Sequence, residues 1–161
     1  MKFTKEERSW VLYDWANSAY TIIVTTAIFP LYYRGFVGEE NYVATWAFAN
    51  SIGSLLLALS APFLGALADY PGVKKRFFLA FLALGVGTTT LLGLPIYSYW
   101  LPLLAVYVAS LYGFSGANLF YDAMLVDVTD HDRMIRVSSA GYAWGYIGGS
   151  TIPFVIAIVT L

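Results

Sequence analysis

The chain has 161 residues, of which 59% are hydrophobic and 12% are charged, and its formal net charge is −1. The nearly balanced charge gives no electrostatic reason to expect a nucleic-acid partner, and the lack of cysteine excludes disulfides and cysteine-based metal sites. A mean hydropathy of +0.66 is far above that of a soluble domain and predicts helices that cross a membrane.

Five apolar stretches have the ~20 residues that a membrane-spanning helix requires. We expect them at about 10–33, 42–68, 77–96, 99–125 and 137–161. The prediction is an all-α membrane protein with one transmembrane domain over residues 1–161, surrounded by a lipid bilayer. The charged start leads into a long apolar run with no small-residue cleavage site, which indicates a retained first helix.

The distribution of positive charge predicts the orientation of these spans. With the N-terminus inside, Arg34 is the only one of the nine lysines and arginines in an outer segment. Cytoplasmic segments carry the excess of basic residues. The N-terminus is therefore expected in the cytoplasm and the C-terminus outside.

The stretch GALADYPGVKKR, residues 65–76, gathers charge between the second and third expected spans. Lys74 and Lys75 are explained as topology signals of an inner loop. Asp69 is expected at the C-terminal end of a helix, where the helix dipole disfavours a carboxylate, so it should have a positively charged or helix N-terminal partner. The plain alternative is an ordinary solvated loop.

This stretch resembles the signature loop of the major facilitator superfamily. The matching residues are Gly65, Leu67, Asp69, Gly72, Lys74 and Lys75, while Tyr70 stands where the superfamily usually has a base. The resemblance implies that Gly65, Asp69, Gly72, Lys74 and Lys75 form a conformational latch between the two halves of a transporter. The segment WVLYDWANSAY at 10–20 is similar to the first helix of the vacuole-effluxer-like branch of that superfamily.

Together the two resemblances imply the N-terminal part of a twelve-helix transporter, an incomplete six-helix half of the major facilitator fold. They imply a secondary transporter without a cofactor, working by alternating access, which moves a small solute in the inner membrane of a bacterium. Efflux of amino acids is the activity associated with the branch. The missing helices imply a homodimer or a separate C-terminal half as partner.

Polar side chains inside the expected spans are the candidates for the transport path. Asp14, Asn17, Ser18, Thr21 and Thr25 share one face of the first span. An ionisable group inside a membrane is a functional hypothesis by default. The expected path residues are Asp14, Asn17, Tyr20, Thr21, Asn118 and Asp122, with Asp14 or Asp122 as the proton or cation site. Two alternatives stay open, namely that Asp14 reaches the headgroups and that Tyr20 only packs.

The fifth expected span carries a regular series of glycines, Gly141, Gly145 and Gly149, at every fourth residue. Small residues at this spacing allow two membrane helices to approach closely. We therefore assign these glycines to helix packing rather than to the path.

Two other classes of protein are weighed against the transporter. An intramembrane enzyme would need an aspartyl dyad, but the Gly-x-Gly-Asp motif of such proteases is missing, and the acids of DVTDHDR lack the rest of a metal-binding motif. We therefore predict no enzymatic activity and no metal site. The alternative function is a non-transporting, truncated or half-size membrane protein that acts only by pairing or as a scaffold.

Overall fold

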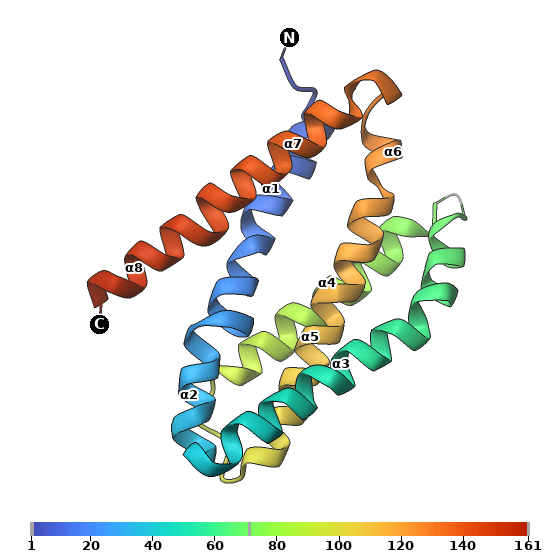
Figure 1. The fold of residues 1–161 in the computed structure, drawn as a ribbon. Helices are drawn as coiled ribbons and strands as arrows, with labels where there is room; N and C mark the ends of the chain where they lie inside the picture. The colour runs from blue at the N-terminus through green and yellow to red at the C-terminus, as the bar shows by residue number, and fades with distance from the viewer. Residues whose placement is uncertain (1, 71, 161) are drawn as a thin grey trace. The chain divides into compact units, whose positions relative to one another are not determined.

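The computed structural model describes residues 2–70 and 72–160, and gives the backbone alone for residues 150, 157 and 160. The described residues form helices and the turns that join them, and no strand occurs within them. Contacts divide the chain into two units, Met1–Tyr32 with Leu125–Leu161, and Tyr33–Met124. Figure 1 shows the course of the chain through its helices.

The central unit is built from three long helices, α3 (Glu39–Ala68), α4 (Lys74–Leu92) and α5 (Trp100–Ala123). Helix α2 (Ile28–Val37) ends in this unit, and the α5 helix packs against both α3 and α4. By length and composition, these three are the helices within the described ranges that can cross a membrane. They correspond to the second, third and fourth expected spans.

The other unit joins the two ends of the chain. Its helices are α1 (Lys5–Tyr20), the π-helix η1 (Thr21–Thr26), the start of α2, α6 (Leu125–Val128), the 3₁₀ turn η2 (His131–Arg133), α7 (Met134–Gly145), the π-helix η3 (Tyr146–Thr151) and α8 (Ile152–Thr160). Helix α1 packs along α7 and η3.

The largest differences between the expected spans and the observed helices concern the third, first and fifth spans. The third span, expected at 77–96, is a helix from Lys74 to Leu92, because Gly93 and Pro95 follow and end it. The first and fifth spans are helical along nearly all of their length, but the π-helices η1 and η3 divide each into shorter helices. The count of five spans therefore stays a prediction.

Helices α4 and α5 touch through their backbones. A Cβ atom added to Gly113 would lie 2.5 Å from the backbone nitrogen of Gly85. One added to Gly116 would meet the ring of Phe81. Nearby, Phe120 stacks on Phe77 and Phe81 with ring centroids 5.4 and 5.9 Å apart. Small residues on one helix thus make room for aromatic rings on the other, the arrangement that lipid-embedded helices need for close contact.

Helices α3 and α5 are joined by a buried polar pair. The hydroxyl of Tyr107, a fully buried residue, donates to Oδ1 of Asn50 at 2.9 Å, and the Asn50 amide donates to the Trp46 carbonyl at 2.8 Å. The ring centroids of Trp46 and Tyr107 lie 4.5 Å apart. A hydrogen bond between side chains and an aromatic contact therefore connect the same two turns.

We expect Tyr107→Phe to lower the free energy of unfolding by about 1 kcal/mol, because it leaves the Asn50 oxygen without this donor inside a membrane helix pair. Equilibrium unfolding in mixed micelles measures this change. Tyr99→Phe is the matched control, because Tyr99 is 75% exposed. Equal stability of the two variants would show that the pair contributes nothing.

The start of α1 is held by a buried carboxylate, Glu7, which is 1% exposed. It accepts hydrogen bonds of 2.7 Å from the Thr129 hydroxyl and from Arg133 Nη2. Its Oε2 also accepts from the Thr4 backbone N–H at 2.8 Å, and its own N–H donates to the Thr4 hydroxyl, which completes a capping box. The hydrogen bond from Thr129 is the main cause that lowers the pKa of Glu7, and Thr4 and Arg133 add to it.

Candidate functional site

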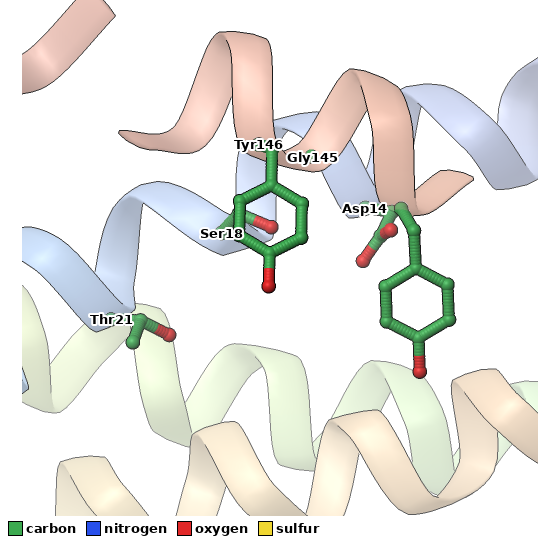
Figure 2. Close-up of a pocket in the computed structure, with 6 residues that line it drawn as sticks. Asp14, Ser18, Thr21, Gly145 and Tyr146 are labelled. Atoms are coloured by element: carbon green, nitrogen blue, oxygen red, sulfur yellow. The ribbon is translucent and has the colours of Figure 1, made fainter. Parts of the chain in front are cut away.

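A polar cavity of about 210 Å³ lies between α1 and the α7–η3 segment, within the unit that joins the chain ends. It is lined by Asp14, Ser18, Thr21, Tyr142, Gly145 and Tyr146. Figure 2 shows the polar ends of Asp14, Thr21 and Tyr146 around the same opening. Asp14 and Ser18 are half-buried, whereas Tyr142 and Tyr146 are 67% and 71% exposed and stand at its mouth.

The helices that form the cavity approach each other through glycines. A Cβ atom added to Gly145 would lie 2.8 Å from Ser18 Oγ and 3.1 Å from Asp14 Oδ2. One added to Gly141 would lie 2.7 Å from the Trp10 ring and 3.2 Å from the same carboxylate oxygen. The lack of a side chain at Gly141 and Gly145 therefore leaves room for the Asp14 carboxylate at the wall of the cavity.

Gly149 continues this series of contacts into η3. A Cβ atom at this position would meet the side chain of Ser18 and lie 2.7 Å from its backbone carbonyl carbon. The three glycines spaced by four residues thus face α1 along Trp10, Asp14 and Ser18 in turn. Each is a position where a larger residue would push the two helices apart.

Both walls of the cavity change from α-helix to π-helix at a lining residue. Thr21 is the first residue of η1, and Tyr146 is the first residue of η3. The Thr25 hydroxyl donates to the Thr21 carbonyl at 2.7 Å, and the Thr151 hydroxyl donates to the Tyr146 carbonyl at 3.2 Å. Threonine side chains thus bond the carbonyls that the wider turns shift. Single π-helical turns within α-helices are frequent at functional sites.

The expected path residues fall into two groups. Asp14 and Thr21 line the cavity. Asn17, half-buried, accepts a hydrogen bond from the Tyr13 hydroxyl at 3.3 Å, and Tyr20 is half-buried at the end of α1.

Asn118 and Asp122 belong to the other unit, on α5. Asn118 is half-buried and Asp122 is exposed. A common path for these two residues and the cavity stays a prediction.

Three lining residues were not among the path residues expected from the sequence, namely Ser18, Tyr142 and Tyr146. Ser18 is part of the polar face noted on the first span. The two tyrosines each follow a glycine of the four-residue series, in the repeated pairs Gly141-Tyr142 and Gly145-Tyr146. This Gly-Tyr repeat could have placed the two tyrosines beside the contact between the helices, because a residue next to a contact glycine lies at the edge of the helix interface.

The loop between α3 and α4 brings its charged residues to the ends of helices. Asp69 is exposed and follows the last residue of α3, and Gly72 has a φ of +76°, a conformation that favours glycine. The Lys74 ammonium donates to the Ala123 carbonyl at 3.0 Å, at the C-terminal end of α5. A base that is unfavourably placed at the start of its own helix thus stabilises the end of another.

Two known proteins align with most of this chain. The chain is 51% identical, over 165 aligned residues, to the "Uncharacterized MFS-type transporter YxiO" of Bacillus subtilis (strain 168), where MFS denotes the major facilitator superfamily. It is 26% identical, over 144 residues, to an "Uncharacterized protein" of Aquifex aeolicus (strain VF5). These alignments cover 99% and 88% of this chain.

The chain spans 38% and 35% of the length of these two relatives. No protein-family model matches it, and no solved structure matches it. The apolar helices α3, α4 and α5 support a membrane-embedded location.

Proposed function

We propose that this chain is part of a secondary transporter of the major facilitator superfamily and moves a small solute by alternating access. The observation that carries the proposal is the 51% identity, over 99% of this chain, to a protein named an MFS-type transporter. The signature-like loop at 65–76 lies between two helices that can cross a membrane, which supports it further. No enzymatic activity is part of the proposal.

The finer parts of the proposal rest on the resemblance of the first helix. We propose that the chain belongs to the vacuole-effluxer-like branch, that it serves efflux of amino acids, and that it lies in a bacterial inner membrane. We propose that the N-terminus is cytoplasmic and the C-terminus external. This orientation places eight of the nine lysines and arginines on the inner side and leaves only Arg34 outside.

The proposed path begins at the cavity with Asp14 and Thr21 and includes Asn17, Tyr20, Asn118 and Asp122. Alternating access in this fold rocks two halves around a central site. The path is therefore completed by a second copy of this chain or by a C-terminal half. The exposed Asp69 is the group that latches onto that second half.

We expect Asp14→Asn to reduce solute flux roughly tenfold or more, because it removes the one carboxylate among the described residues that line the cavity. A tenfold change corresponds to the loss of ~1.4 kcal/mol of favourable interaction. The measurement is uptake of a radiolabelled amino-acid mixture into proteoliposomes that contain the chain, with and without an imposed pH gradient. The substitution keeps the size of the side chain and removes its charge.

Asp132→Asn is the matched control, because Asp132 is an exposed acid in the η2 turn and is not among the residues that line the cavity. Flux in Asp14→Asn equal to that of the wild type would reject the site. A correctly folded wild type that carries no flux at all would reject transport by this chain and favour the scaffold alternative.

A further inference from the structure

The polar side-chain atoms of the residues that line the cavity are all oxygens. They are the carboxylate of Asp14 and the hydroxyls of Ser18, Thr21, Tyr142 and Tyr146, while Gly145 contributes backbone. No lysine, arginine or histidine is among the described lining residues. The cavity therefore carries one negative charge when Asp14 is ionised, surrounded by neutral hydrogen-bonding groups.

The Asp14 carboxylate is available to a ligand. Within residues 2–70 and 72–160, no hydrogen bond or ion pair involves it, although it is half-buried. Its Oδ2 atom lies against the backbone of α7, where Gly141 and Gly145 leave space that a Cβ atom would narrow to about 3 Å. An ionised group that is partly withdrawn from water without a partner gains much from an opposite charge.

The hydroxyls are placed to complete the coordination of such a charge. Ser18 and Thr21 follow Asp14 by four and seven residues and so share its helix face. Tyr142 and Tyr146 are one turn apart on the opposite wall, and Figure 2 shows the Tyr146 ring beside the opening. Donor atoms from two helices thus surround one space.

We propose that this cavity binds a monovalent cation, with Asp14 as its counter-ion and the Ser18, Thr21 and tyrosine hydroxyls as its hydrogen-bonding or coordinating oxygens. Carboxylate and hydroxyl oxygens suit hard cations, and a single carboxylate balances a single charge. The cavity is many times larger than the ~10–15 Å³ that one water needs. It therefore admits the ammonium group of a small organic solute as well as a bare sodium ion. This proposal deepens the proposed function, because it names the chemistry that the solute or the coupling ion presents to the path.

Binding to the purified chain in detergent tests this proposal without requiring transport. Isothermal titration calorimetry is performed with methylammonium chloride, sodium chloride and, as an anionic probe, tetramethylammonium acetate. The buffer is neutralised with tetramethylammonium hydroxide, which offers no N–H group. Saturable binding of methylammonium, of sodium or of both is expected, and comparison of the two titrations shows whether an ammonium group or a free ion is the ligand.

Two variants change the cavity in different ways. Asp14→Asn removes the charge, and Gly145→Ala places a methyl group between Asp14 and Ser18; each is expected to weaken cation binding about tenfold or more. Asp132→Asn should bind as the wild type does. Gel filtration and circular dichroism check that each variant is folded, and Gly145→Ala keeps the test valid if Asp14→Asn is not.

The proposal is overturned if neither cation binds, if acetate binds in their place, or if Asp14→Asn and Gly145→Ala both bind with wild-type affinity. Failure of this proposal is distinguishable from failure of the proposed function. Cation binding without flux would reject transport by this chain and leave the site standing. Flux without cation binding would reject the site alone.

Discussion

Replacing Glu7 by glutamine is expected to lower the thermal stability of the protein markedly. The side chain keeps its shape, but the buried position then lacks the negative charge that Arg133 Nη2 contacts at 2.7 Å. Arg133 is partly buried, with 26% of its side chain exposed. A partly buried cation that loses its charged partner costs more stability than an exposed ion pair that is broken. The melting temperature of the purified protein in detergent measures the effect.

The pH dependence of stability identifies the same group. The folded structure lowers the pKa of Glu7, chiefly through the hydrogen bond from Thr129, so its contribution is complete above the ordinary value of 4.5. That contribution is lost as the pH falls from the ordinary value through the lowered pKa. In this range the unfolded chain binds a proton at Glu7 more readily than the folded protein does, so acid favours unfolding. The difference in melting temperature between the wild type and Glu7→Gln should therefore be constant above 4.5 and shrink below it.

The neighbouring acid provides the control for this experiment. Glu6 is exposed and precedes Glu7 in the same first turn of α1. Glu6→Gln changes the net charge and the helix-dipole interaction by the same amount but leaves the buried cluster intact. If both variants melt at the same temperature, the cluster does not stabilise the start of α1.

Gly113→Leu is expected to separate α4 from α5 and to lower the free energy of unfolding by about 1–3 kcal/mol, the usual cost of overpacking. The cost should lie at the upper end of this range, because the obstacle is backbone. A Cβ atom at this position would lie 2.5 Å from the nitrogen and 2.7 Å from the Cα atom of Gly85. Equilibrium unfolding in mixed micelles measures the change.

Gly87→Leu introduces the same side chain two residues beyond Gly85, on a part of α4 where a Cβ atom meets nothing within 4 Å. It should leave stability unchanged or raise it slightly, since leucine is a better helix former than glycine. A loss in Gly87→Leu as large as that in Gly113→Leu would mean that glycine-to-leucine changes act through the unfolded chain and not through this contact.

The lengths of the apolar runs predicted five spans, and three of these correspond to helices that are long and apolar enough to cross a membrane. The second span ends at Ala68 as expected, and the fourth, expected at 99–125, is a helix from Trp100 to Ala123. Composition carries this information because a bilayer-spanning helix must be apolar along its whole length. The end of the third at Leu92 depended on the local effect of Gly93 and Pro95, which hydropathy does not detect.

Contacts between distant residues could not be predicted from the chain alone. Lys74 lies 49 residues from the Ala123 carbonyl that it caps, and Glu7 lies 126 residues from Arg133. The pattern Thr4-x-x-Glu7 is the local sequence signature of a capping box, although we did not predict one from it. Its long-range partners, Thr129 just after α6 and Arg133 in η2, depend on packing that no local pattern describes.

Part of the candidate site followed from helical periodicity. The spacing of Asp14, Ser18 and Thr21 predicted a shared face, and these three residues line the same cavity. Asn17 belongs to the polar face by spacing, yet its side chain bonds to Tyr13. Periodicity assigns a residue to a face but does not determine which neighbour its side chain contacts.

The two π-helices have a consequence for how this chain can differ from its relatives in length. A π-helical turn closes its hydrogen bond over one residue more than an α-helical turn does. Deleting one residue from Thr21–Thr26 or Tyr146–Thr151 can therefore be absorbed by a return to α-helix, with all later residues of that helix rotated by about 100°. These two six-residue segments are the points at which a single insertion or deletion, rather than a substitution, changes which residues face the cavity.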